Sequence, residues 1–348
     1  MIKLSIIVPV YNVEPYIRPC FESIFNQGLD ENDYEVIIVN DGSTDKSMEM
    51  VTDIISQHNN ITVFNQKNQG LSIARNNGIA AAKGEYILMP DSDDLLIEKS
   101  LPSLLDIALR TKADIVVADF FKMTNEEIIH NEPIQRTEII TKEKTGEELF
   151  LEDLSPYECY VWRSLFRKDF IIENDLKFYP GIKYQDIPFT HECCLKANKC
   201  VRTSQFLNIY RRRPGSTTYS FRLSKAPDFC IAIAQTWKLT YLENLSPQLL
   251  KKLKNDIYIS LTMLIYLISH DNSSFAEKKK VMKFLKELAP EMSFNNGIKQ
   301  RLYSVLYQKC PMTLVLFRYI YGIVIDDTIR PLHRALLKIL NNYEREHH

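Results

Sequence analysis

Short apolar runs and amphipathic stretches alternate along the first third of the chain. The apolar runs predict buried strands at residues 4–10, 34–40, 61–65, 86–89 and 114–120. The stretches between them carry apolar residues at helical spacing and predict helices at 13–26, 46–58, 70–82 and 100–110. Strands that alternate with helices form mainly parallel sheets with right-handed crossovers. We therefore expect an α/β fold with a doubly wound, mainly parallel sheet.

The pattern changes twice beyond residue 121. Residues 125–143 are polar and predict a hairpin or an irregular segment. The next region predicts helices and strands in turn, at 164–174, 176–179, 187–198 and 201–210. From residue 227 only helical patterns are found, at 249–268, 275–288, 298–306, 311–325 and 328–341. We expect an α/β domain over 1–220 and an all-helical domain over 221–348.

The composition is that of a folded protein with reduced cysteines. Hydrophobic residues make up 45% of the 348 residues, which is enough for a sizeable core. The net charge of −1 argues against a nucleic-acid partner. Seven cysteines without a Cys-x-x-Cys pair fit neither a disulfide framework nor a zinc site, so we expect a cytoplasmic protein. Pro9 and Asn12 interrupt the apolar start, which favours a first strand over a signal peptide.

Three carboxylates follow the expected strand at 86–89. Asp91, Asp93 and Asp94 come directly after its apolar residues, where a parallel sheet binds its ligands. Crowded carboxylates repel one another, and a hard divalent cation such as Mg²⁺ or Mn²⁺ relieves that repulsion. The alternative is a solvated turn that leads into a helix, with Asp94 as the N-cap.

Polar segments also follow the other expected strands and would line the same crevice. They lie at 9–12, 39–45 and 68–78. Asp41 could accept hydrogen bonds from a base or a ribose, and Arg75 could bind a diphosphate through two N–H groups. The alternatives are a turn at Asp41, a surface helix position for Arg75 and a cap or turn role for Asp45. No G-x-G-x-x-G or Walker loop is present, which disfavours dinucleotide-binding and P-loop proteins.

Four ordered motifs together carry a family resemblance. They are Ser5-Ile-Ile-Val-Pro-Val-Tyr-Asn12, Val39-Asn-Asp-Gly-Ser-Thr-Asp45, Asn68-Gln-Gly-Leu-Ser-Ile-Ala-Arg-Asn76 and Pro90-Asp-Ser-Asp-Asp94. In this order they resemble the family 2 inverting glycosyltransferases of the GT-A fold, over about residues 1–220. The resemblance implies transfer of a sugar from a nucleotide donor to a hydroxyl, with inversion at the anomeric carbon.

The resemblance also implies a role for each matching residue. By this resemblance, the nucleotide base is contacted by Pro9, Tyr11 and Asp41. The nucleotide-sugar is also contacted by Arg75 and Asp91. Asp93 matches the metal ligand of the Asp-x-Asp motif, which implies Mn²⁺ or Mg²⁺.

A later part of the resemblance concerns the general base and a closing loop. Asp186 matches the general base of a Glu-Asp pair, whereas Gln185 stands where the family has a glutamate. Tuning of the base by a second carboxylate is therefore in doubt. Arg211 and Arg213 resemble arginines of a loop near the diphosphate, and the alternative for them is a solvated turn.

These expectations combine into one predicted function. The chain is expected to transfer a sugar, with a UDP-sugar favoured as donor, to a glycan or lipid-linked glycan in surface polysaccharide assembly. The alternatives are a nucleotidyltransferase acting on sugar phosphates and an inactive protein that binds nucleotide-sugars.

The expected helices at 311–325 and 328–341 leave two interpretations open. The first is too short to span a bilayer, and the second combines an apolar stripe with basic residues. Such a pair can lie on the inner face of the cell membrane. The alternative, which we favour slightly, is that both helices pack on the core or form a homodimer interface.

Overall fold

The chain forms two compact units. The computed structural model describes residues 1–130, 136, 138–156, 158–213 and 222–321. One unit comprises Met1–Ser220 with Lys238–Lys252, and the other comprises Phe221–Trp237 with Leu253–His348.

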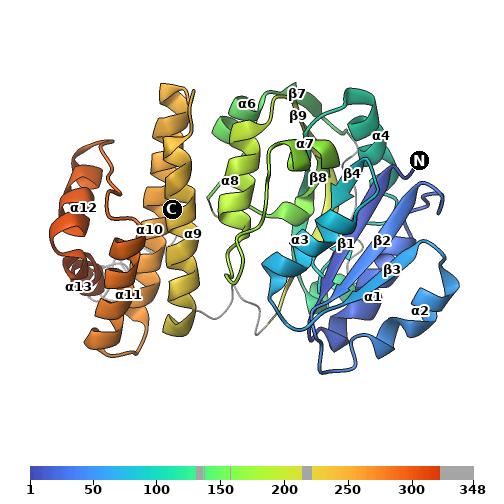
Figure 1. Cartoon of the computed structure of the whole chain (residues 1–348), viewed down its shortest axis with the longest axis horizontal. Coiled ribbons are helices and arrows are strands. Elements are labelled where there is room, and N and C mark those ends of the chain that lie inside the picture. Colours follow the sequence, from blue (N-terminus) through green and yellow to red (C-terminus); the bar gives the residue numbers. More distant parts are fainter. Residues whose placement is uncertain (131–135, 137, 157, 214–221, 322–348) are drawn as a thin grey trace, which may run out of the picture. The chain divides into compact units, whose positions relative to one another are not determined.

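The first unit is built on a nine-stranded sheet (Figure 1). Its strands follow one another across the sheet in the order β3 (Ile61–Asn65), β2 (Tyr34–Asn40), β1 (Leu4–Val10), β4 (Tyr86–Leu88), β8 (Ser164–Arg167), β6 (Ile115–Thr124), β9 (Cys200–Arg212) and β5 (Leu95–Leu96), and β7 (Thr141–Lys144) pairs with β9. Strands β1–β4 are parallel neighbours, and β6 and β9 run in the same direction. Strands β5, β7 and β8 run the other way. The prediction of a mainly parallel α/β sheet is confirmed.

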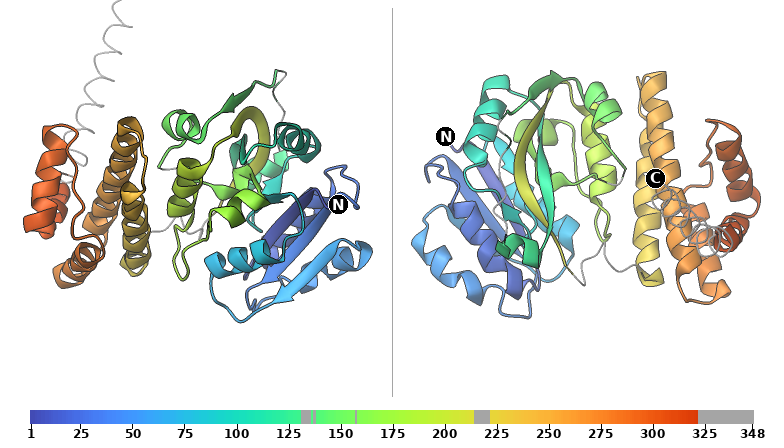
Figure 2. Two further views of the ribbon diagram at one scale, coloured as in Figure 1. Left: turned by 45° about the horizontal axis from the view of Figure 1, so that its top comes forward. Right: turned by 180° about the vertical axis from the view of Figure 1, so that it is seen from behind.

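Helices cover both faces of this sheet (Figures 1 and 2). They are α1 (Glu14–Phe25), α2 (Thr52–Gln57), α3 (Leu71–Ala81), α4 (Leu101–Thr111), α5 (Asn125–His130), α6 (Gly146–Glu152), α7 (Lys168–Glu173) and α8 (Asp186–Lys196). Four details of the prediction were wrong. Asn125–His130, expected to lie in a hairpin or an irregular segment, form α5. The expected helix at 46–58 is a 3₁₀ turn, Glu49–Val51, followed by the short α2, without a side-chain cap. Residues 164–167 form strand β8 instead of a helix, and 176–179 are irregular.

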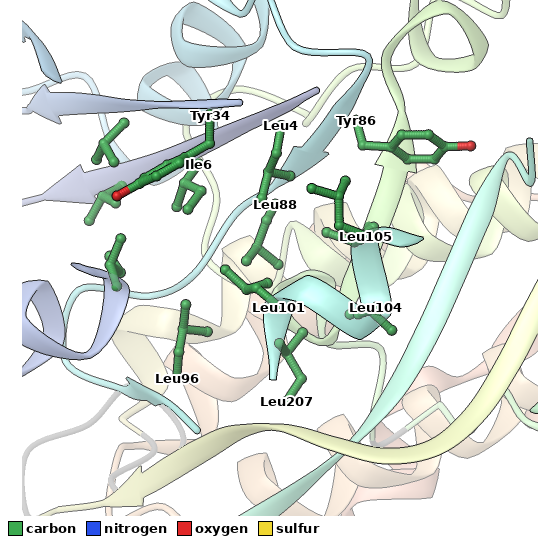
Figure 3. Close-up of a cluster of buried hydrophobic side chains, with 14 of the residues drawn as sticks. Leu4, Ile6, Tyr34, Tyr86, Leu88, Leu96, Leu101, Leu104, Leu105 and Leu207 are labelled. Atoms are coloured by element: carbon green, nitrogen blue, oxygen red, sulfur yellow. The ribbon is translucent and has the colours of Figure 1, made fainter. Parts of the chain in front are cut away.

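Alternation along β1 explains how both faces of the sheet are covered. Leu4, Ile6 and Val8 join a buried cluster that includes residues of α1 and α4 (Figure 3). Ile7 points to the opposite face, where α3 packs so closely that a Cβ on Gly78 would lie 2.2 Å from Ile7 Cγ2. In the same cluster the Tyr86 hydroxyl donates to the carbonyls of two residues, Ala108 and Ala113. Because β1 pairs in parallel with both β2 and β4, the carboxyl ends of all three strands lie at one edge of the sheet.

The described part of the second unit is helical. Its helices are α9 (Ala226–Lys238), α10 (Pro247–His270), α11 (Phe275–Leu288), α12 (Ile298–Lys309) and α13 (Pro311–Tyr321), of which the last residue of α9 and the start of α10, up to Lys252, belong to the first unit. The expected buried helix at 249–268 is confirmed, since α10 buries residues such as Leu261, Leu264 and Ile268. The expected helix at 328–341 lies outside the described residues. Within the described part of the chain, every helix is too short or too polar to cross a membrane.

Candidate active site

The three carboxylates after β4 form one cluster. The ligand oxygens of Asp91, Asp93 and Asp94 lie within 4.8 Å of one another. Asp94 does not cap a helix, because the chain continues into β5 and α4 begins only at Leu101. The helix-capping alternative is therefore wrong, and the cluster stands at the carboxyl edge of the sheet.

The electrostatics of this cluster suit a divalent cation. Burial raises the pKa of Asp91 to about 7, Arg75 opposes this rise, and Asp93 and Asp186 add to it. Burial, together with Asp93 and Asp91, raises the pKa of Asp94 well above its usual range. Among the described residues, the buried Oδ2 of Asp94 has no hydrogen-bond partner. A buried carboxylate oxygen without a partner is costly, and hard cations prefer such oxygens as ligands.

Arg75 connects this cluster to the first residue of α8. Its side chain is fully buried on α3. One terminal nitrogen donates to Asp91 Oδ1 and the other to Asp186 Oδ1, each at 2.7 Å. The guanidinium carbon also lies 5.2 Å from the ring centroid of Phe178. Arg75 is therefore not a surface residue, and it holds two carboxylates from distant segments in fixed positions.

The side chains of Arg75 and Gln185 position Asp186. It opens α8, and it follows Tyr184, whose positive φ of 56° is rare for a residue with a side chain. Gln185 donates through its amide nitrogen to Asp186 Oδ1 at 3.0 Å. A glutamate at that position would instead add a second negative charge. Within the described residues, both hydrogen bonds to this carboxylate go to Oδ1 and none to Oδ2.

Two arginines at the end of β9 contact the acid cluster. The backbone N–H of Arg211 donates to Asp94 Oδ1, and its Nε donates to the Asp93 carbonyl, both at 2.8 Å. Arg213 donates to Asp93 Oδ2 at 2.9 and 2.7 Å. Both guanidinium groups also lie over the ring of Tyr16. The solvated-turn alternative is wrong for these two arginines.

Asp41 organises a loop beside the cluster. It is buried after β2 and accepts hydrogen bonds at 2.7–2.8 Å from the Gln66 side chain and from the backbone N–H groups of Gln69 and Gly70. The carboxylate therefore orders the entrance to α3. Sequence reasoning assigned it only to a ligand or a turn, and this holding role was missed.

The end of β1 lies next to β2 on the same edge. Pro9 is paired with Val39 inside the sheet, whereas Tyr11 is 47% exposed just beyond the strand. Asp45 accepts from the backbone N–H groups of Glu14 and Ser47, both at 3.0 Å, so it is a turn residue, as the alternative expected, and it does not cap the 3₁₀ turn that follows. Tyr11 is thus an accessible side chain of this edge.

Several residues of the site were not expected from the sequence. Phe178 lies beneath Arg75, and Asn125 accepts from Arg211 at 2.8 Å. The Cys20 thiol lies under the cluster, 3.7 Å from the Asp91 carbonyl, and burial together with the three carboxylates raises the pKa of that thiol well above its usual value. These residues belong to no contiguous motif, and an apolar or polar residue type alone gives no signal for them.

The geometry of the acid cluster and its arginines is typical of one class of protein. Acids, arginines and an ordered helix entrance meet at the carboxyl edge of a mainly parallel sheet, as in α/β proteins that bind phosphorylated ligands there. The model of the family described as "Glycosyl transferase family 2" matches residues 5–172. The glycosyltransferase GlyG of Streptococcus pneumoniae is 30% identical over 238 residues, which cover 65% of this chain and 76% of GlyG. The chain belongs to glycosyltransferase family 2.

Two further comparisons extend this result. The glycosyltransferase EpsJ of Bacillus subtilis is 36% identical over 217 residues, which span 62% of this chain and 62% of EpsJ. The crystal structure of Staphylococcus aureus TarS 1–349 with UDP superimposes with a TM-score of 0.70 at 20% identity, covering 92% of this chain and 91% of that one. The chain therefore has the GT-A fold of these glycosyltransferases.

Proposed function

We propose that the protein transfers a sugar from a nucleotide-sugar to a hydroxyl in a single inverting displacement. The observation that carries this proposal is the Arg75 bridge, which joins Asp91 of the acid cluster to Asp186 at 2.7 Å on each side. The bridge holds a candidate base beside the acids that would bind the donor. In an inverting displacement the acceptor hydroxyl attacks from the face opposite the leaving group, so the base must lie beside the bound donor. Such a displacement forms no covalent intermediate with the enzyme. We assign donor binding and catalysis to residues 1–220, and the remaining residues to a helical domain.

We propose UDP as the nucleotide of the donor. TarS, which shares the fold, was crystallised with UDP and with UDP-GlcNAc. Tyr11 is exposed where a base would lie, and Asp41 orders the adjoining loop and retains lone pairs for the imide N–H of uracil.

We propose Mn²⁺ or Mg²⁺ as the cofactor. Asp93 would be its principal ligand, with Asp91 and Asp94 beside it. When bound, the cation would neutralise the diphosphate and act as a Lewis acid for its departure. The mannosyltransferase PcManGT of Pyrobaculum calidifontis, which has a TM-score of 0.53, was crystallised with GDP-Man and Mn²⁺.

The side chains of the site have separate tasks in this reaction. Asp186 takes the acceptor proton through Oδ2 while Arg75 and Gln185 hold Oδ1. General-base catalysis of this kind contributes about 10²–10⁴-fold to the rate. Arg211 and Arg213 carry positive charge to the edge where the diphosphate leaves. Their attraction for the departing charge favours the transition state over the bound donor.

Release of free nucleotide tests the proposal. Nucleotide-sugars are incubated with the protein and Mn²⁺ or with excess chelator, and thermal shift with each nucleotide-sugar identifies the donor, because a ligand of the folded state raises the melting temperature. We expect metal-dependent release of UDP. Binding without release would indicate an inactive nucleotide-sugar-binding protein, and pyrophosphate release from a nucleoside triphosphate and a sugar phosphate would indicate a nucleotidyltransferase.

We also propose that the helical domain contacts an anionic membrane on the cytoplasmic side. Helix α12 turns Gln300, Ser304 and Tyr307 inward. The apolar side chains that α12 and α13 leave at least half exposed are Ile298, Leu302, Val305, Leu316, Phe317 and Ile320. We call these six residues the apolar surface. Residues 298–321 also include Lys299, Arg301, Lys309 and Arg318 but no acidic residue. Apolar and basic side chains together favour an anionic lipid surface, and such contact would suit a lipid-linked glycan acceptor.

Sedimentation with liposomes tests the membrane contact. We expect binding to phosphatidylglycerol vesicles that weakens with salt and is lost in Leu302→Ser/Phe317→Ser. Phe275→Ser is the control, because Phe275 is 61% exposed on α11, outside the apolar surface. Absence of binding at low salt would refute the contact, and a concentration-dependent mass lost in the double variant would show a homodimer interface instead.

A further inference from the structure

Three aromatic rings from two distant segments stack on one another in the first unit. The ring centroids of Tyr160 and Trp162 lie 4.7 Å apart, and those of Tyr160 and Tyr210 lie 5.6 Å apart, with interplanar angles of 11° and 25°. Trp162, which also stacks on Tyr210 at 5.7 Å, is 1% exposed, whereas both tyrosines are partly exposed. Phe120 packs edge-on against Tyr160 and Trp162. We call Tyr160 and Tyr210 the tyrosine platform.

The pairing of the strands places this platform at the edge of the sheet that carries the acid cluster. Strand β8 is antiparallel to β4, with Phe166 opposite Ile87, so the residues before Ser164 lie beyond the carboxyl end of β4. In the antiparallel pair of β6 and β8, Val117 is opposite Ser164. From Val117, β6 continues towards Lys122 in the direction of the same edge. Tyr210 is opposite Lys122 in the parallel pair of β6 and β9. Both tyrosines therefore lie on the side where Asp91 emerges.

The platform lies near both the acid cluster and Asp186. Tyr210 directly precedes Arg211, which contacts both Asp93 and Asp94. Burial raises the pKa of Tyr160, and the negative charge of Asp186 is among the groups that add to this rise, so the two side chains lie within electrostatic reach. In the part of the chain that the structure describes, the Tyr160 hydroxyl makes no hydrogen bond. None of the roles assigned to donor, cation or base uses these two rings.

We propose that the tyrosine platform is the acceptor subsite and that it binds a pyranose ring of a saccharide acceptor. This inference rests on the proposed glycosyl transfer and narrows its acceptor. The C–H face of the sugar would lie on the two rings, which buries apolar surface on both partners. The hydroxyl of Tyr160 would accept or donate a hydrogen bond at the sugar's polar rim. A ring held there presents a hydroxyl to Oδ2 of Asp186.

The charges around the platform favour a neutral sugar over an anionic acceptor group. Glu158 and Asp186 carry negative charge nearby, and Lys122 is paired with Glu158 at 2.6 Å. Arg163 is buried beside Asp119 and donates to the Ala118 carbonyl. Lys122 and Arg163 are therefore not directed to a phosphate on the platform. An uncharged sugar ring with one apolar face is compatible with the two tyrosine rings and with the negative charges of Glu158 and Asp186.

Ligand-detected NMR on the full chain tests the subsite. The probes are methyl β-D-glucopyranoside, methyl β-D-galactopyranoside and cellobiose, each added to the protein with UDP and Mg²⁺. We expect saturation transfer to the ring C–H protons of at least one probe. Tyr160→Leu and Tyr210→Leu should weaken its binding by about tenfold or more, because stacked aromatic contacts carry energies of that order. Tyr160→Phe should keep most of the binding, since it retains the ring.

Controls separate this inference from the proposed function. UDP binding is measured by calorimetry on the same samples and should be unchanged in all three variants. Tyr241→Leu replaces another exposed tyrosine of the first unit, outside the platform, and should leave probe binding unchanged. Saturation transfer that is absent for every probe, or equal in Tyr160→Leu, Tyr210→Leu and the parent chain, overturns the subsite while UDP binding persists. Failure of UDP itself to bind would contradict the proposed function instead.

Discussion

The two halves of the sheet differ in how their functional residues are carried along the chain. In the half formed by β1–β4, each polar segment directly follows a strand, and all four strands are parallel neighbours. In the half formed by β5–β9, antiparallel pairs join segments up to about a hundred residues apart, such as β5 with β9. The first half therefore presents a site made of contiguous motifs. The second half completes it with residues that only long-range pairing brings together.

The difference between the two halves of the sheet suggests that one half binds the donor and the other binds the acceptor. Contiguous strand-end motifs suit the donor, whose nucleotide needs one fixed set of contacts at the carboxyl edge. The longer and more irregular connections of the second half suit the acceptor, because loops and curled strands can vary without disturbing the parallel core. Substitutions in the two halves should therefore affect donor binding and acceptor use separately.

The largest effect is expected at the boundary between the halves. Asp93→Ala should abolish transfer and remove the response to Mn²⁺ or Mg²⁺, because it removes the principal cation ligand and the partner of Arg213. Asp93→Asn is the matched control for side-chain volume and should also be inactive. The melting temperature should change little, since the side chain lies outside the core. Full activity of Asp93→Ala, or of the parent chain in excess chelator, would refute the cation assignment.

A smaller but selective loss is expected in the second half. Asp186→Asn keeps the shape of the side chain but cannot take a proton, so transfer should fall by at least about 10²-fold. UDP affinity measured by calorimetry should stay near that of the parent. Gln185→Ala, which removes only the neighbouring hydrogen bond to Oδ1, should have a weaker effect. Normal turnover combined with lost donor binding would make Asp186 a donor-binding residue. It would then contradict the assignment of donor binding to the first half of the sheet alone.

A change in donor preference is expected in the first half. Asp41→Ala should reduce UDP affinity by about tenfold and bring it close to that for GDP and ADP, because it removes a charged hydrogen-bond acceptor and releases the loop at Gln69 and Gly70. Asp41→Asn should be intermediate, since it retains one acceptor oxygen. Calorimetry with the three nucleotides measures this. Equal affinities in the parent chain would contradict the assignment of uridine.

The smallest effect concerns packing in the first half. Gly78→Ala should lower the free energy of unfolding by about 1–3 kcal/mol, because the added methyl group meets Ile7. Denaturant unfolding measures the loss, and UDP binding at low temperature should persist. A stability equal to that of the parent would show that α3 can move away from β1, so that the entrance to the donor site is less rigid than the packing indicates.

Sequence alone predicted the elements whose signals are local. The alternation of apolar runs with helical spacing predicted the mainly parallel sheet, and strand ends at Asp41 and Asp91 predicted where the polar groups would gather. The expected helix at 164–174 is present as α7 over Lys168–Glu173 but was wrong for Ser164–Arg167. Those four residues pair with both β4 and β6, and burial on both sides outweighs local helical spacing.

Tertiary structure decided the contacts that depend on distant segments. Sequence could propose Arg75 and Asp186 one by one, but only the packing of α3 against the segment before α8 brings them to 2.7 Å. Nothing in the types of Tyr160 and Tyr210 distinguishes them from core aromatics, and their stacking depends on the pairing of β6 with both β8 and β9. Local patterns specify which face of an element is apolar, whereas the free energy of burial summed over the whole core decides which faces meet.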